Sequence, residues 1–213
     1  MAKRFATATS PRGTFVFPHF TTPDTKYQAA GEYHTKVAFD LKDPAALAFF
    51  AKLEAVRDQF ISDNPDDLSP AVIKKANINS VFEEECDQEG NETGRGFVRC
   101  KLKAKVETKT KSWTQKPALF DAQAKPITDT ELQVWSGSEG KVNVEMVPYY
   151  MASTKTVGIS LRLKGVQLLK VISGSTDDAG GMGFGEEDGF VAESSGFTAA
   201  PATATDTDDD DEF

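Results

Sequence analysis

The sequence predicts a mainly β domain that carries one amphipathic helix and ends in an acidic C-terminal segment. Several runs of about ten residues alternate apolar and polar side chains, which is typical of half-buried strands. One other stretch repeats its apolar residues at three- and four-residue steps, as one face of a helix does. Residues 174–213 hold seven glycines and twelve acidic residues but no Lys or Arg, and offer little to bury.

Charge is divided unevenly along the chain. The 213 residues carry a formal net charge of −9. Residues 174–213 contribute −12, which leaves 21 acidic and 24 basic residues, or +3, in residues 1–173. The acidic total therefore does not exclude a polyanionic partner, because the distribution of charge decides what a surface attracts.

Composition also narrows the class of protein. Two scattered cysteines, Cys86 and Cys100, and two histidines are too few for a disulfide framework or a structural zinc site, so we expect a reduced, cytoplasmic protein. No apolar run reaches membrane-spanning length, and no apolar stretch follows the basic N-terminal residues, so we expect no signal peptide. Phosphate-loop, zinc-protease and serine-hydrolase motifs are absent, so we predict no catalytic residue, cofactor or metal ion.

The first half of the chain is predicted to hold an arm, a strand and the helix. Residues 1–30 are expected to form an irregular N-terminal arm with at most a short edge strand over 13–18, because prolines at this density disfavour a central strand. Alternation predicts a strand over 32–41. Asp43-Pro44 is typical of a helix start, with Asp as the N-cap. The apolar face of the helix over 44–61 is expected to comprise Leu47, Phe50, Leu53, Val56 and Phe60.

The second half is predicted to be strands joined by turns. A short helix over 69–76 and a strand over 78–86 precede an acidic turn, and further strands are expected over 97–106, around 142–147 and over 157–164. Gly165 is predicted to lie at a β-bulge, because the apolar register shifts after it. The domain is expected to span residues 31–172, and residues 173–213 are expected to form a disordered acidic tail.

The strand over 97–106 is the most informative segment. Side chains alternate along a strand, so one face is apolar and the other carries a row of cations with Phe97 at its start. Cationic strand faces with aromatic neighbours hold single-stranded nucleic acid through phosphate contacts and base stacking. The candidate DNA-binding residues are Arg99, Lys101, Lys103, Lys105, Lys109, Lys111, Trp113, Tyr149 and Arg162.

Each of these features has an ordinary structural alternative. A row of lysines can be a solvated strand face that discourages edge pairing. Tyrosines at a strand end, such as Tyr149, also occur as core or rim packing. An acidic tail can serve solubility alone, or it can mimic a nucleic-acid backbone and occupy the basic groove when DNA is absent. A flexible tail of 40 residues has a reach of about 35 Å, which is enough to meet its own domain.

The sequence resembles the single-stranded DNA-binding proteins of T7-like bacteriophages. The resemblance is colinear over nearly the whole chain. It is carried by Met1-Ala2-Lys3-Arg4-Phe5, by Gly31 to Leu41 running into Asp43-Pro44, by Phe97-Val98-Arg99-Cys100, by Val147-Pro148-Tyr149 through Thr156-Val157-Gly158 to Leu163, and by an acidic tail that ends in Phe. This tail is less densely acidic than is usual in the family.

The resemblance implies a five-stranded OB-fold Greek-key barrel with one packed α-helix, and a homodimer. It also implies a non-enzymatic protein of phage DNA replication, recombination and repair in the infected bacterial cell, which coats single-stranded DNA, removes secondary structure and promotes annealing. The tail is then expected to contact the phage DNA polymerase and the helicase–primase through Asp208, Asp209, Asp210, Asp211, Glu212 and Phe213.

Two other classes of function remain open from the sequence. The chain could be a protein-interaction module that uses its basic face, its acidic tail and Phe213 without nucleic acid. A nuclease is the third class, and it requires an acidic metal site on the basic face. Quenching of tryptophan fluorescence by oligothymidylate separates the first two classes.

Overall fold

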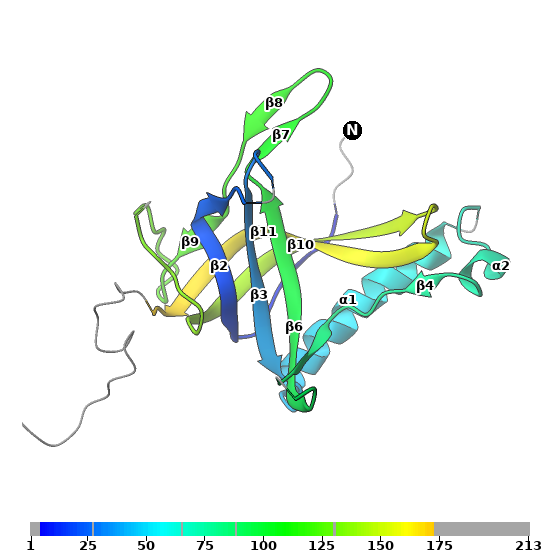
Figure 1. Ribbon diagram of the computed structural model, residues 1–213, viewed down its shortest axis with the longest axis horizontal. Coiled ribbons are helices and arrows are strands. Elements are labelled where there is room, and N and C mark those ends of the chain that lie inside the picture. Colours follow the sequence, from blue (N-terminus) through cyan, green and yellow to red (C-terminus); the bar gives the residue numbers. More distant parts are fainter. Residues whose placement is uncertain (1–4, 27, 65, 88, 130, 173–213) are drawn as a thin grey trace, which may run out of the picture. The chain divides into compact units, whose positions relative to one another are not determined.

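The structure is a computed structural model that describes residues 5–172 except residues 27, 65, 88 and 130 (Figure 1). Residues 173–213 lie outside the described residues, and so do the predicted disordered tail and the partner-binding residues placed in it. The described elements are, in chain order, β1 (Thr7–Thr9), β2 (Gly13–Asp24), β3 (Glu32–Asp40), α1 (Pro44–Asp63), α2 (Pro70–Ile73), β4 (Asn77–Ile78), β5 (Glu83–Cys86), β6 (Glu92–Lys103), β7 (Lys105–Glu107), β8 (Ser112–Thr114), β9 (Ala118–Phe120), β10 (Glu139–Met151) and β11 (Thr156–Lys170).

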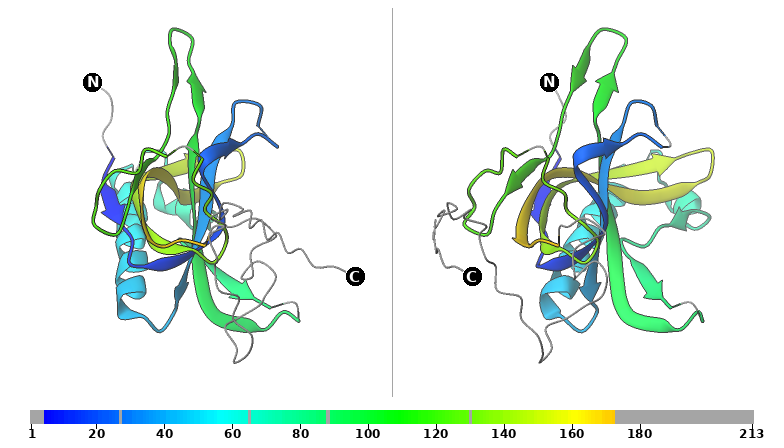
Figure 2. Two further views of the ribbon diagram at one scale, coloured as in Figure 1. Left: turned by 90° about the vertical axis from the view of Figure 1, so that its left-hand side faces the viewer. Right: turned by 60° about the vertical axis from the view of Figure 1, so that its left-hand side comes forward.

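Five of the strands close into a ring. The order around the ring is β10, β2, β3, β6 and β11, and β10 pairs with β11 to complete it. All neighbours in the ring are antiparallel except β6 and β11, which are parallel. A closed five-stranded ring with non-sequential order is the Greek-key barrel of the OB fold. The predicted mainly β fold with one main helix is therefore confirmed; the left view of Figure 2 looks into the ring, with α1 along one side.

Helix α1 covers one side of the core and packs aromatic side chains against it. Its buried residues are Ala46, Phe49, Phe50 and Leu53. The ring of Phe50 stacks on Phe82 at 4.4 Å and meets Phe39 of β3 edge-on at 5.8 Å. Leu47, which the periodicity placed on the apolar face, is 49% exposed. Phe50 and Leu53 of the predicted face are buried, and Ala46 and Phe49 are buried in place of Leu47.

The predicted start of α1 is confirmed by its capping hydrogen bond. Oδ1 of Asp43 accepts from the backbone N–H of Ala45 at 2.8 Å, and Pro44 occupies the first helical position. We expect Asp43→Ala to lower the free energy of unfolding by about 1 kcal/mol, because an N–H at the helix N-terminus loses its acceptor. Chemical denaturation measures this loss. Asp43→Ser supplies a replacement acceptor and is the control; an equal loss in both variants would show that the cap does not cause the effect.

The prediction of an irregular N-terminal arm is wrong for residues 7–24. Residues 7–9 form β1 and residues 13–24 form β2, which is a full member of the ring. Phe15 and Phe20 of β2 lie in the core with their rings edge-to-face at 5.1 Å. The prolines are tolerated because the ladder with β3 is already irregular on both sides of His19, where their missing N–H groups cost little. Burial of two phenylalanines thus outweighs the local proline signal.

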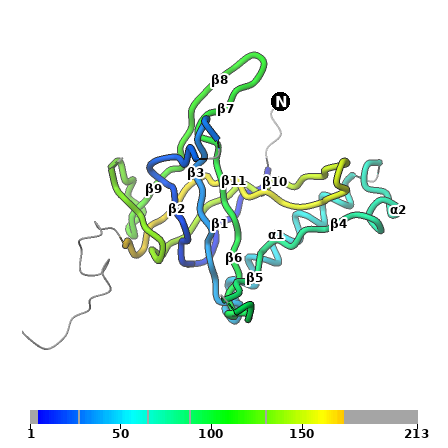
Figure 3. The backbone as a smooth tube through the Cα atoms, viewed as in Figure 1, coloured from blue at the N-terminus to red at the C-terminus, as the bar shows by residue number. Residues whose placement is uncertain are grey.

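Two further predictions about strands have different outcomes. The strand expected over 78–86 is divided: β4 pairs with β11, whereas β5 pairs with β6. The bulge expected at Gly165 is confirmed, since Asn143 pairs with Gly165 while the next residue of β10 pairs with Leu163. Figure 3 traces the β10–β11 hairpin beyond the ring to the side of β4.

Candidate nucleic-acid interface

Strand β6 lies in the middle of the candidate face, between β3 and β11. Its predicted alternation is confirmed: Val98, Cys100 and Leu102 are buried, whereas the cations between them are exposed. Pairing sets the neighbours of these cations. Lys36 lies opposite Arg99, His34 and Arg162 lie on either side of Lys101, and Glu32 lies opposite Lys103. Because directly opposed residues share a face, the cations of β6 join those of two other strands.

Two hollows on this face meet at Lys101 and Ser160, and we call the pair the groove. The first hollow, of about 590 Å³, is lined by Tyr149, Phe97 and Arg99 among others. The second, of about 450 Å³, is lined by Trp113, Lys103 and Arg162 among others. Each hollow thus combines an aromatic ring with cations, which is the combination that binds single-stranded nucleic acid.

The groove brings together six of the nine candidate residues. Three candidates lie elsewhere, on or next to the projecting hairpin that β7 and β8 form (Figure 1). Lys105 of β7 is paired with Glu107 at 2.6 Å, and this pairing lowers the pKa of the Glu107 carboxyl. Lys109 and Lys111 are exposed at the turn of the hairpin and line neither hollow. The linear sequence could not show where the hairpin bends away from β6.

Two arginines of the groove already have carboxylate partners. Arg99 donates to Glu83 of β5 through two bonds, Nε to Oε1 at 2.9 Å and a terminal nitrogen to Oε2 at 2.8 Å. This bidentate contact raises the pKa of Arg99. Arg162 pairs with Glu145 of β10 at 2.6 Å. These pairs reduce the net positive charge of the groove in the folded protein.

Lys101 and Lys103 differ from the arginines. Within the part of the chain that the structure describes, no carboxylate lies within 4.0 Å of either ammonium group. Both side chains are exposed. Their charge is therefore available to an anionic ligand without first breaking an ion pair.

Two more residues lie beside the cations of β6: Phe97, which the sequence placed at the start of the cationic face, and Lys36, which the sequence prediction left out of the site. Nζ of Lys36 lies 4.3 Å above the centre of the Phe97 ring, and the Arg99 guanidinium lies 5.7 Å from it. Cations over an aromatic face are attracted by its quadrupole, so the ring holds both side chains at the surface. Lys36 carried a signal, because it alternates outward on its own strand, but only the pairing of β3 with β6 places it beside Arg99.

The two candidate stacking residues differ in exposure. Trp113 of β8 is 45% exposed and lines the second hollow. Tyr149 of β10 is half-buried: its hydroxyl accepts from Nδ2 of Asn79 at 3.1 Å, and its ring packs over Gly158. A Cβ at position 158 would lie 2.6 Å from that hydroxyl, so any other residue there would displace the Tyr149 side chain. Tyr149 therefore packs at the rim and lines the groove at once.

The Arg99–Glu83 pair gives a prediction about charge. Glu83→Gln leaves the shape of the first hollow nearly unchanged and frees Arg99 for an anionic ligand. We expect binding of oligothymidylate to tighten by roughly three- to tenfold at low salt, because one more cation is available for phosphate. Fluorescence anisotropy measures the change. Glu89→Gln, at an exposed acid outside the groove, is the control for net charge; the prediction fails if both variants tighten binding equally.

No helix among the described residues is both long enough and apolar enough to cross a membrane.

Comparisons with known proteins bear on the fold. No family model and no curated protein sequence matches this chain. Among solved structures, gp2.5, a single-stranded DNA-binding protein encoded by bacteriophage T7, matches with a TM-score of 0.60 and 20% identity over 89% of this chain and 100% of that chain. The single-stranded DNA-binding protein from bacteriophage Enc34 in complex with ssDNA matches with a TM-score of 0.53 and 8% identity over 78% of this chain and 88% of that chain. A further structure of the Enc34 protein matches with a TM-score of 0.52 and 8% identity over 82% and 88% of the two chains. The fold expected from the sequence resemblance is therefore confirmed.

Proposed function

We propose that this protein binds single-stranded DNA along the groove, without preference for sequence and without catalysing a reaction. The observation that carries the proposal is the position of Lys101, where two hollows meet that each hold an aromatic ring and cations. Phosphates would contact Lys101, Lys103 and the two arginines, and bases would stack on Trp113 and Tyr149. Stacking on the faces of bases discriminates little between them, so binding should tolerate any sequence.

The proposal gains support from proteins of the same fold. One of them is described as a single-stranded DNA-binding protein of bacteriophage T7, and another was solved in complex with ssDNA. OB barrels in general bind oligonucleotides on a strand face. The basic face on β3, β6 and β11 lies on such a barrel, and its cations come from all three strands.

A salt-dependent titration tests the function. Oligothymidylate and duplex DNA are titrated side by side into the full-length protein over a range of salt concentrations. We expect preference for the single strand and a log–log salt slope of about −2 to −3, since each neutralised phosphate of a single strand contributes roughly −0.7. Absence of binding to either DNA at low salt would reject the proposal. It would favour the second candidate function, a protein-interaction module that uses the basic face and the acidic tail.

The acidic tail is proposed to regulate this binding and to recruit replication proteins. The proposal rests on the charge of residues 174–213, which is −12, against +3 for residues 1–173. Asp208 to Glu212 and Phe213 would contact the phage DNA polymerase and helicase–primase when DNA occupies the groove. Deletion of residues 193–213 should tighten DNA binding and abolish capture of the polymerase. A truncated protein that behaves as the full-length chain does in both assays would contradict this proposal.

We also propose a role in phage DNA replication, recombination and repair, as a homodimer that coats single strands and promotes annealing. Light scattering of the purified protein tests the dimer, and annealing of two complementary oligonucleotides tests the activity. A monomer at all concentrations would reject the dimer without affecting the DNA-binding proposal.

A further inference from the structure

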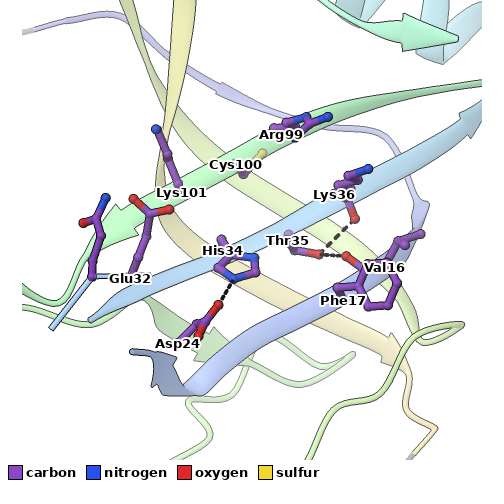
Figure 4. Close-up of a pocket in the computed structure, with 11 residues that line it drawn as sticks. Val16, Phe17, Asp24, Glu32, His34, Thr35, Lys36, Arg99, Cys100 and Lys101 are labelled. Atoms are coloured by element: carbon purple, nitrogen blue, oxygen red, sulfur yellow. Dashed lines mark hydrogen bonds and ion pairs between the residues drawn. The ribbon is translucent and has the colours of Figure 1, made fainter. Parts of the chain in front are cut away.

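His19, Asp24 and His34 form a cluster next to the groove, and none of the three is among the proposed DNA contacts. One ligand atom from each residue lies within 4.8 Å of the other two. Nε2 of His34 lies 3.3 Å from Oδ2 of Asp24, and the two imidazole rings have centres 4.7 Å apart. Figure 4 shows Asp24 and His34 facing each other at one side of a hollow of about 340 Å³.

We propose that these three residues form a binding site for Zn²⁺. Two imidazoles and one carboxylate are a ligand set typical of zinc, which binds nitrogen and oxygen at about 2.0–2.2 Å in a tetrahedral arrangement. Two ligand atoms of such a site lie about 3.3 Å apart, which is the separation of the His34 and Asp24 atoms. His19 has to approach by at most about 1.5 Å, which a change in its side-chain torsions provides.

The irregular ladder between β2 and β3 builds the cluster. His19 lies directly opposite His34, and in a regular ladder the residue opposite Glu32 would be Thr21. Three extra residues of β2 bring Asp24 to that position instead. The irregular segment of β2 between His19 and Asp24 contains Pro23. Its missing N–H costs little there, because this segment does not pair regularly with β3. A bulge that re-aims a side chain is a common feature near functional sites.

Charges of both signs surround the cluster: Lys101 lies directly opposite His34, whereas two carboxylates lie on the side of β2 and β3 away from it. Asp24 and Glu32 lie directly opposite each other on β2 and β3, and like charges in this position destabilise a sheet. Lys103 lies opposite Glu32 on its other side and offsets part of this repulsion. The backbone N–H of Lys26 donates to Oδ1 of Asp24 at 2.8 Å, and the other carboxylate oxygen, Oδ2, faces His34.

The cysteines do not complete an alternative site. Burial raises the pKa of the Cys100 thiol to about 12, so this residue offers no thiolate at neutral pH. Cys86 is exposed on β5 and is not part of the cluster. With three protein ligands, the fourth position of the zinc ion would hold water or an exchangeable anion.

Calorimetric titration of ZnCl₂ into full-length protein without an affinity tag tests the proposal. We expect one saturable zinc per chain, bound by the two imidazoles and the Asp24 carboxylate. Loss of an outer-shell partner alone weakens metal binding by about 10–100-fold, so His19→Ala, His34→Ala and Asp24→Asn should each weaken binding by at least about tenfold. Cys86→Ser is the control that keeps the site and removes the exposed thiol.

NMR of the unmodified protein provides a second test, which does not depend on whether the variants fold. The chain has two histidines, so NMR signals from imidazole nitrogens report on the proposed ligands alone. Stoichiometric zinc should shift both sets of signals in the unmodified protein. Unshifted imidazole signals, or zinc binding that survives in His34→Ala, would overturn the proposal and assign the metal to acidic residues elsewhere. Both experiments omit DNA, so their failure leaves the DNA-binding proposal standing.

Discussion

Replacing Lys101 with alanine is expected to weaken binding of oligothymidylate by about tenfold or more at low salt. The ammonium group lies where both hollows meet and has no carboxylate partner within the part of the chain that the structure describes. A hydrogen bond to a charged group contributes about 1.5–3 kcal/mol, which corresponds to roughly 10- to 150-fold in affinity. Lys101→Glu should weaken binding further, because a like charge then faces the phosphates.

The salt dependence separates a phosphate contact from a general loss of folding. With Lys101→Ala, the log–log salt slope should become shallower by roughly 0.7, the contribution of one phosphate. Fluorescence anisotropy over a salt series measures affinity and slope together, and thermal unfolding checks the fold. Lys125→Ala is the matched control, since Lys125 is an exposed lysine that lines neither hollow. An unchanged slope in Lys101→Ala would show that this side chain does not meet a phosphate.

Replacing Trp113 with alanine is expected to weaken the same binding with no change in salt slope. Stacking of one base on an aromatic side chain contributes about 1–3 kcal/mol, or roughly 5- to 150-fold in affinity. Trp113 is 45% exposed and pairs with Val106 in a two-stranded hairpin, so its removal should affect the barrel little. Trp113→Phe keeps an aromatic face and should recover most of the affinity.

Fluorescence provides an independent check on Trp113. The chain has two tryptophans, and Trp135 lines a different hollow, with His19 and Phe20. Oligothymidylate should quench the emission of a Trp135→Phe variant, in which Trp113 is the remaining indole. Emission of Trp113→Phe should stay constant. The opposite pattern would place the bound strand near Trp135 and reject the groove as the binding surface.

Most strands of the barrel could be predicted from the sequence. The predictions that are wrong have a common cause. The N-cap of α1 and the alternation of β6 depend on residues a few positions apart, and both predictions are confirmed. The prediction of an irregular N-terminal arm is wrong because Pro18 and Pro23 indicate only local irregularity. The burial of Phe15 depends on contacts with strands far away in the sequence. Long-range burial overrides local preference in such cases.

For the candidate site, the sequence identified the types of residue but not their partners. Lys101 and Lys103 were expected on one face of a strand, and they lie there. Nothing in the linear order indicated that Glu83 would meet Arg99, or that Glu145 would meet Arg162. The role of these residues in binding DNA stays a prediction until the titrations are done.

By itself, the sequence determined the divided charge, the cap of the helix and the alternating face of β6, because each depends on composition or on local periodicity. The tertiary structure alone decided which strands flank β6, which carboxylates pair with its arginines, and that Asp24 lies beside His34 and opposite Glu32. These properties depend on the register between segments far apart in the chain. A shift of one residue in that register turns every side chain of a strand to the other face, and no local pattern specifies it.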